Sequence, residues 1–210
     1  ANEQAILAYG PSATLRSDDA GATWTRAGSG LTVGYLMSGK VYGIDGDGRL
    51  VGDGDDFLSG GQGNDALDGG AGNDWAFHDG ATAGVTVNLG TGSVTGGAGN
   101  DTLTGIEWVG GSAYDDSLTG NGGNNLLQGR AGNDTLDGAG GTDTADYYQA
   151  TAGVTASLAS NTATGDGNDT FISIENINGS LFADSLTGDG NNNNLFGAAG
   201  NDTLTGNGGN

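Results

Sequence analysis

Apolar residues recur along most of this chain, from about residue 51 onward, each standing two positions after an acidic or amide residue. The polar members are Asp56, Asp65, Asp74, Asp101, Asp116, Asn125, Asp134, Asp143, Asp169, Asp184, Asn193 and Asp202. The apolar members are Leu58, Leu67, Ala76, Leu103, Leu118, Leu127, Leu136, Ala145, Phe171, Leu186, Leu195 and Leu204. Gly, Asn and Asp fill most of the intervals, and these residues favour turns. The pattern predicts short strands, each with one buried side chain, joined by glycine-rich turns.

A longer repeat overlies the short one. Residues 81–86 (ATAGVT) return as residues 150–155, and residues 132–136 (GNDTL) return as residues 200–204. We therefore interpret residues of about 70–137 and 138–205 as a duplicated module. Each copy also contains a wider segment, such as residues 85–89, whose alternating pattern predicts a strand. Stacked repeats of this kind bury one another's apolar faces, which predicts a solenoid.

Residues 1–50 differ from the repeats and contain strand candidates at residues 6–9, 13–16 and 23–26. Residues 17–24 read SDDAGATW, which resembles the Asp-box hairpin turn of sialidase-like β-propeller blades. The resemblance implies a structural role, with the aspartate capping the turn. We expect a short β segment here and, after it, a separate repeat domain over residues 51–210.

Charge and composition restrict the function. The chain has 26 acidic residues against 5 basic ones, a net charge of −21, and 46 glycines among its 210 residues. Such a chain repels nucleic acid and anionic membranes and attracts cations. It has no cysteine, so disulfides and thiolate metal sites are excluded, and with His78 as its single histidine it has no histidine-based triad or zinc site. We find no nucleophile–base pair and predict that the chain is not an enzyme.

The tandem sequence of residues 60–77, GGQGNDALD followed by GGAGNDWAF, resembles the G-G-x-G-x-D-x-U-x nonapeptide of the RTX (haemolysin-type calcium-binding) family. The resemblance implies an all-β fold, a right-handed parallel β-roll in which two nonapeptides make one coil. Loops 18 residues apart would then stack and hold several Ca²⁺ ions between them. Four pairs of sixth-position residues have this spacing: Asp56 and Asp74, Asp116 and Asp134, Asn125 and Asp143, and Asp184 and Asp202.

The resemblance assigns metal-binding roles to the sixth-position aspartates and to loop glycines. The predicted ligands are Asp56, Asp65, Asp74, Asp101, Asp116, Asp134, Asp143, Asp169, Asp184, Asp202, Gly61, Gly63, Gly70, Gly72, Gly97, Gly99, Gly132, Gly141 and Gly200. The uncharged Asn125 and Asn193 indicate weak or empty sites. The loops before Asp116 and Asp184 have lost glycines that the pattern requires.

We expect calcium to be required for folding. Ordering nine residues costs on the order of 9 kcal/mol in backbone entropy, whereas burying one leucine returns roughly 1.5–3 kcal/mol. Stacked carboxylates repel one another until a cation lies between them. The family is mostly exported unfolded by type I secretion, which implies an extracellular location.

Two functions remain open at this point. One is a non-catalytic, calcium-rigidified structural protein, such as a filament, surface-layer or adhesin component that associates end to end. Residues 206–210 carry no polar cap, so we expect an open β-edge that pairs with another copy. The other is the calcium-dependent appendage of a secreted enzyme such as a propeller glycosidase. The Asp-box-like motif favours this second function.

Overall fold

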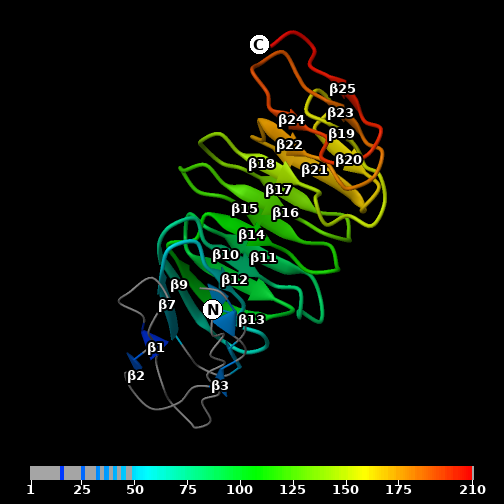
Figure 1. Ribbon diagram of the computed structural model, residues 1–210. Coiled ribbons are helices and arrows are strands. Elements are labelled where there is room, and N and C mark those ends of the chain that lie inside the picture. Colours follow the sequence, from blue (N-terminus) through cyan, green and yellow to red (C-terminus); the bar gives the residue numbers. More distant parts are fainter. Residues whose placement is uncertain are drawn as a thin grey trace. The chain divides into compact units, whose positions relative to one another are not determined.

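The computed structural model describes residues 54–209 in full and, before them, only the backbone of seven strands (Figure 1). These strands are β1 (Leu15–Arg16), β2 (Thr25–Arg26), β3 (Thr32–Val33), β4 (Leu36–Met37), β5 (Lys40–Val41), β6 (Ile44–Asp45) and β7 (Arg49–Asp53). The described part of the chain contains strands and no helix, so it holds no helix that could cross a membrane. The predicted all-β class is confirmed. The chain divides into two compact units, residues 1–109 and 110–210.

The described part of the first unit contains two larger sheets and two antiparallel two-stranded sheets, β3-β6 and β4-β5. Its further strands are β8 (Phe57–Leu58), β9 (Ala66–Ala71), β10 (Trp75–Phe77), β11 (Val85–Asn88), β12 (Ser93–Gly96), β13 (Gly99–Thr104) and β14 (Trp108–Gly110). One larger sheet has the order β2-β1-β7-β9-β13-β12-β11, and the other larger sheet has the order β14-β10-β8. Successive nonapeptides therefore alternate between these two sheets, as two repeats per coil require.

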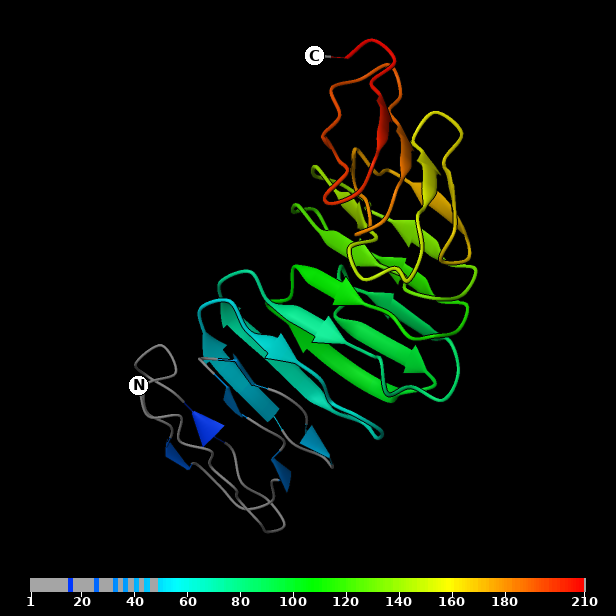
Figure 2. The same ribbon diagram turned by 45° about the vertical axis from the view of Figure 1, so that its right-hand side comes forward.

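The second unit repeats this arrangement (Figure 2). Its strands are β15 (Ser117–Thr119), β16 (Leu126–Gln128), β17 (Thr135–Asp137), β18 (Thr144–Asp146), β19 (Thr155–Ser157), β20 (Thr162–Thr164), β21 (Asn168–Ile172), β22 (Asn176–Asn178), β23 (Ser185–Thr187), β24 (Leu195–Phe196) and β25 (Thr203–Thr205). One sheet runs β15-β17-β21-β20-β19-β23-β25 and the other β24-β22-β18-β16.

The eighth-position apolar side chains form the core between the sheets. Parallel pairing places them opposite one another, as for Leu58 with Ala76 and Leu118 with Leu136. All four of these side chains are fully buried. Their neighbours at positions seven and nine alternate to the outer face, as a strand period of two dictates. The predicted buried slot is therefore confirmed through most of the repeats.

The wider segment of each module is an antiparallel excursion. The strand expected at residues 85–89 is present as β11, and it pairs antiparallel with β12, which pairs antiparallel with β13. In the second unit β19, β20 and β21 are joined in the same way. Each excursion adds antiparallel pairing to one sheet of the otherwise parallel roll. The apolar side chains of β11 and β12, such as Val87 and Val94, are buried and extend the core.

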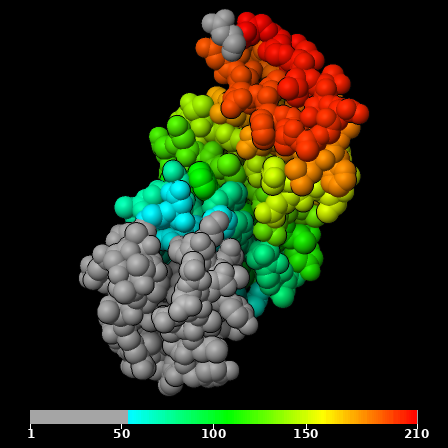
Figure 3. Space-filling model, viewed as in Figure 1, coloured from blue at the N-terminus to red at the C-terminus, as the bar shows by residue number. Residues whose placement is uncertain are grey.

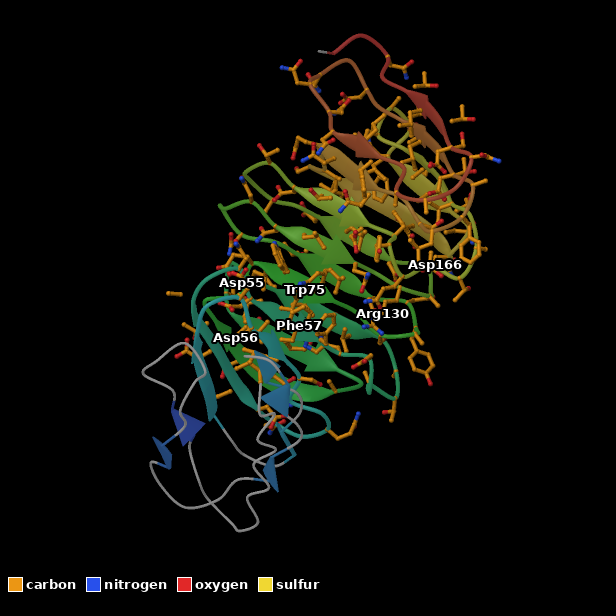
Figure 4. All side chains as sticks on the ribbon, in the orientation of Figure 1. Asp55, Asp56, Phe57, Trp75, Arg130 and Asp166 are labelled. Carbon is orange, nitrogen blue, oxygen red and sulfur yellow. The ribbon has the colours of Figure 1, made fainter. Side chains whose placement is uncertain are left out.

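Aromatic side chains cover the outer face of the smaller sheet in the first unit. Phe57 of β8 stacks on Trp75 of β10 with ring centroids 6.2 Å apart (Figure 4). Trp75 also stacks on Phe77 at 4.9 Å and meets the edge of Trp108 at 5.5 Å. These contacts make Trp75 and Trp108 part of the aromatic cover of this sheet.

Only part of the predicted N-terminal segment lies within the described residues. Strands β1 and β2 pair antiparallel, with Leu15 opposite Arg26. They flank residues 17–24, the predicted Asp-box turn, which itself lies outside the described residues. The strand predicted at residues 6–9 lies outside them as well.

Candidate calcium-binding loops

The sixth-position side chains form a ladder from coil to coil. In each case a side-chain oxygen accepts a hydrogen bond from the backbone N–H of the sixth residue of the preceding coil. The bonds join Asp56 N–H to Asp74 (2.7 Å), Asp116 N–H to Asp134 (2.8 Å), Asn125 N–H to Asp143 (2.7 Å) and Asp184 N–H to Asp202 (3.0 Å). The structure thus brings together all four of the pairs that stand 18 residues apart.

Asp101 and Asp169 join the same ladder across a longer sequence interval. Asp65 N–H donates to Asp101 at 2.9 Å, and Asp134 N–H donates to Asp169 at 3.0 Å. The two intervals are 36 and 35 residues. They are longer because an antiparallel excursion intervenes before β13 and β21 return to the parallel register.

Two glutamates occupy sixth positions that the sequence analysis missed. Asp74 N–H donates to Glu107 Oε2 at 3.1 Å, and Asp143 N–H donates to Glu175 Oε2 at 2.8 Å. Their coils lack the glycine-rich loop, so an alignment on glycine passes over them. A signal was nevertheless present: an apolar residue follows each glutamate two positions later, at Val109 and Ile177.

A second ladder uses the fifth-position side chains and has the opposite polarity. Here the side chain of one coil accepts from the backbone N–H of the next coil. Asn73 N–H donates to Asp55 at 2.9 Å, and Asn133 N–H donates to Asp115 at 2.7 Å. Where both bonds form, as between the coils of Asp56 and Asp74 and those of Asp116 and Asp134, the interface is tied in both directions.

The fourth-position glycines lie where coils touch. Gly72, Gly132, Gly141 and Gly200 have φ between 126° and 142°, and a Cβ on any of them would press against a backbone carbonyl of the preceding coil. For Gly132 that oxygen is Tyr114 O, only 2.5 Å from the position a Cβ would take. Glycine is needed here for both backbone conformation and close approach.

The other predicted loop glycines fall into two groups. Gly61, Gly63 and Gly70 lie in glycine-rich loops with positive φ. Gly97 lies in the turn between β12 and β13, and Gly99 begins β13, where it pairs with Gly96. That turn belongs to the antiparallel excursion, so the backbone there differs from that of the other loops.

Asp74, Asp134 and Asp143 each carry a buried carboxylate oxygen that no hydrogen bond satisfies. All three residues are at most 1% exposed, and the oxygen without a partner is Oδ2 in each. A buried carboxylate oxygen without a partner is costly, because it has lost its hydration and gained nothing in return. A cation beside these oxygens removes that cost.

Burial shifts the protonation of the same aspartates. It raises the pKa of Asp74 and Asp134 to about 7 and that of Asp143 to about 6. Nearby carboxylates add to the rise, and the ladder hydrogen bond offsets part of it. Without an ion, the folded loops therefore disfavour the ionised form of these aspartates near neutral pH.

At the return strands, the chain's own side chains compensate the acid. The Tyr147 hydroxyl donates to Asp169 Oδ2 at 2.8 Å. At the corresponding place in the first unit, His78 lies close enough to Asp101 to counteract part of the rise that burial causes in its pKa. These two aspartates thus have neighbours that Asp74, Asp134 and Asp143 lack.

The loops fit calcium by the chemistry of their donors. In the part of the chain that the structure describes, no three His, Cys, Asp or Glu side chains gather closely enough to hold a metal by themselves. Calcium takes about 6–8 oxygen ligands and accepts carbonyls alongside carboxylates. Asp74, Asp134 and Asp143 would supply the charged ligands, and glycine-rich backbone would supply the remainder.

Comparison with known proteins agrees with the geometry. No curated protein matches the chain. A model described as the RTX calcium-binding nonapeptide repeat matches in four copies, at residues 42–77, 88–105, 110–145 and 175–210. These matches span more than half of the sequence and include the stacked loops. The chain belongs to the RTX calcium-binding nonapeptide repeat family.

Proposed function

We propose that this chain is a secreted, non-catalytic structural module whose β-roll folds when calcium binds between its loops. The observation that carries the proposal is the set of buried, unsatisfied Oδ2 atoms on Asp74, Asp134 and Asp143. Each is held in place by ladder hydrogen bonds that do not themselves neutralise the charge. An ion that binds only the folded chain stabilises it by mass action, about 1.4 kcal/mol for each tenfold excess over Kd.

The family and the charge support an extracellular setting. RTX repeat proteins are generally exported by type I secretion, and free calcium is scarce in the cytosol and plentiful outside the cell. With a net charge of −21, the ion-free chain resists compaction through self-repulsion. Folding would then begin where calcium becomes available.

Circular dichroism tests the folding switch. In excess EDTA the chain should show a mainly disordered spectrum, and added calcium should produce a β-rich one. A β-rich spectrum that chelation leaves unchanged would refute calcium-dependent folding.

A pair of alanine variants tests the register of the sites. Asp134→Ala removes a buried oxygen from the ladder and should raise the calcium concentration needed for folding. Asp166→Ala removes an acid outside the sixth position, in a loop of the same unit (Figure 4), and should have a much smaller effect. Equal effects would show that the sixth position holds no special role.

Self-association forms the second part of the proposal. Leu204, the eighth-position residue of β25, is 49% exposed, whereas Leu186, the eighth-position residue of β23, is fully buried. The end of the chain that contains β25 is red in Figure 3. A further coil stacked on β25 would bury the Leu204 side chain, and we propose that a second copy of the chain supplies it. An edge of this kind templates strand addition.

Light scattering with and without calcium tests the association. Leu204→Lys should abolish calcium-dependent assembly, and Leu181→Lys, at an equally exposed leucine in the loop before β23, should retain it. Monodisperse folded monomers of the parent chain at high calcium and high protein concentration would instead favour an appendage role.

The second candidate function is the calcium-dependent appendage of a secreted enzyme. The antiparallel pairing of β1 with β2 around the Asp-box-like residues favours it. Sequence upstream of this chain discriminates the two functions: further Asp-box motifs at regular spacing support an appended propeller, and their absence supports the structural module.

A further inference from the structure

Outside the antiparallel excursions, the glycine-rich loops that the structure describes in full, from residue 60 onward, fall into two conformational classes. In the first class, which we call open loops, the second residue has a left-handed backbone. These residues are Gly61, Gly70, Arg130, Ala139 and Ala198, with φ between 59° and 82°. The fourth residue of each open loop is a glycine with φ between 126° and 142°.

In the second class, which we call self-capped loops, neither of these two residues has a positive φ. The second residue of a self-capped loop is Ser112, Asn121, Ser180 or Asp189. The fourth residue is Tyr114, Gly123, Phe182 or Asn191. Glycine is dispensable at the fourth position in this class because the backbone there is ordinary. In the self-capped loops, glycine can therefore be replaced at positions two and four for the same reason: neither position has a positive φ.

The self-capped loops satisfy the sixth residue from within. Ser180 donates its backbone N–H to Asp184 Oδ2 and its hydroxyl to Asp184 Oδ1, both at 2.7 Å. The same hydroxyl accepts the N–H of Phe182 at 3.0 Å. Ser112 makes the same three contacts, with Asp116 and Tyr114. Both oxygens of these carboxylates therefore have a donor inside their own loop.

The two self-capped loops with asparagine at position six, Asn125 and Asn193, form the corresponding internal hydrogen bonds from backbone N–H groups but have no negative charge at that position. Asn121 donates its N–H to Asn125 Oδ1 at 2.8 Å and accepts the N–H of Gly123 at 2.7 Å. Asp189 makes the equivalent bonds with Asn193 and Asn191. In neither loop does a sixth-position carboxylate require a counter-ion.

The open loops, in contrast, provide too few hydrogen-bond donors for their sixth-position carboxylates. Asp74, Asp134 and Asp143, each with a buried Oδ2 that has no hydrogen-bond partner, belong to open loops. Their second residue directs no hydroxyl or amide toward the carboxylate, because it is Gly70, Arg130 or Ala139. What a serine supplies in a self-capped loop must come here from a cation.

We propose that the second residue of each loop decides whether calcium binds there: open loops take an ion, and self-capped loops fold without one. This inference rests on the proposed calcium-dependent folding and refines it. It places ions at the loops of Asp74, Asp134 and Asp143, and also at the open loops of Asp65 and Asp202. It removes Asp116 and Asp184 from the predicted ligands of their own loops, although both carry the sixth-position acid.

The test exchanges the two classes in the full chain. Ser180→Gly/Phe182→Gly restores glycine at both positions of a self-capped loop and should bind one more calcium ion per chain than the parent. Ala139→Ser introduces the capping hydroxyl beside Asp143, in a loop where Gly140 and Gly141 allow the backbone to change, and should bind one fewer. Ala139→Gly keeps the left-handed conformation and should leave the number unchanged.

Calorimetric calcium titration gives the stoichiometry, and circular dichroism at saturating calcium shows that each variant folds. Unchanged stoichiometry in both Ala139→Ser and the glycine double variant, with parent-like spectra, overturns the proposal. A parent chain that binds no calcium overturns the proposed function instead. If the double variant does not fold, the Ala139 pair decides: loss of an ion in Ala139→Ser alone supports the proposal, and equal stoichiometry overturns it.

Discussion

A single methyl group at the fourth position of an open loop would strike the coil beside it. At Gly132 the strain of a left-handed backbone adds to the contact with Tyr114 O. Gly122, in the neighbouring self-capped loop, has ordinary φ and nothing within 4 Å of a would-be Cβ. Both glycines lie in glycine-rich loops, but only Gly122 has space for a methyl group.

Gly132→Ala should therefore destabilise the calcium-bound roll by about 1–3 kcal/mol or more, the cost of a non-glycine residue in a strained conformation. Thermal unfolding at fixed, saturating calcium measures it. Gly122→Ala is the matched control and should change the free energy of unfolding by well under 1 kcal/mol. Equal losses in the two variants would mean that the contact with Tyr114 O has no energetic weight.

For single residues, the sequence predicts which side chains are buried better than which aspartates would bind calcium. The slot two residues after each acid is a local property of an extended segment, so Leu118 and Leu136 are found by counting. Whether an aspartate needs a cation depends on which donors its own loop turns toward it. Asp116 and Asp134 share a position in the repeat, yet a serine caps the first and nothing within its own loop caps the second.

Among the elements, the strands without a glycine loop are the least expected. β14 and β22 follow Glu107 and Glu175, whose longer side chains reach the ladder and accept the N–H of the sixth residue in the coil before. Glu175 also adds to the repulsion that raises the pKa of Asp143. The open loop of Asp143 thus has a second carboxylate facing it from β22.

Glu175→Gln retains a hydrogen-bond acceptor and removes this charge. We expect the calcium affinity of the Asp143 loop to fall several-fold, because one of two facing carboxylates is lost, while the ion-free chain becomes less expanded. Calcium titration followed by circular dichroism measures both effects. Asp115→Asn makes the same charge change at an exposed fifth position of the same unit and should leave the affinity nearly unaltered.

The excursions were predictable as strands but not as hairpins. Alternation in residues 85–89 is a local signal, and β11 confirms it. The antiparallel pairing of β11 with β12 depends on the turn at residues 89–92 and on the buried contacts of Val87 and Val94 with the core. The nine-residue repeat encodes neither this turn nor these contacts. It therefore indicates only that the regular coil is interrupted.

For the whole molecule, protons and calcium compete for the same carboxylates. The pKa of Asp74 and Asp134 is about 7 in the ion-free fold, against an ordinary value of 3.8. Below about pH 4 these groups hold a proton whether the chain is folded or not. As the pH rises toward 7, the unfolded chain ionises them freely while the fold resists, so the ion-free fold loses stability across this window.

Acidification should therefore partly replace calcium. In EDTA, lowering the pH from 8 to 5 should increase the β-signal of the chain, and calcium affinity should be weaker at pH 5 than at pH 8. Circular dichroism across this range measures the first effect, and calorimetric titration the second. Asp134→Asn, which carries no titratable group at this position, should show a smaller gain on acidification. Loss of β-structure on acidification would contradict the assignment of these pKa values.

The antiparallel excursions also show how the roll accommodates extra sequence. One sheet runs out through β20 and back through β21, and the ladder between Asp134 and Asp169 resumes at 3.0 Å. The turn at the outer end, residues 158–161, places Ser160 in solvent, away from the loops of the ladder. A foreign peptide grafted at this turn would be displayed on a scaffold whose assembly calcium controls. The duplicated module thus provides two insertion points, one in each unit, for an engineered surface that chelation releases.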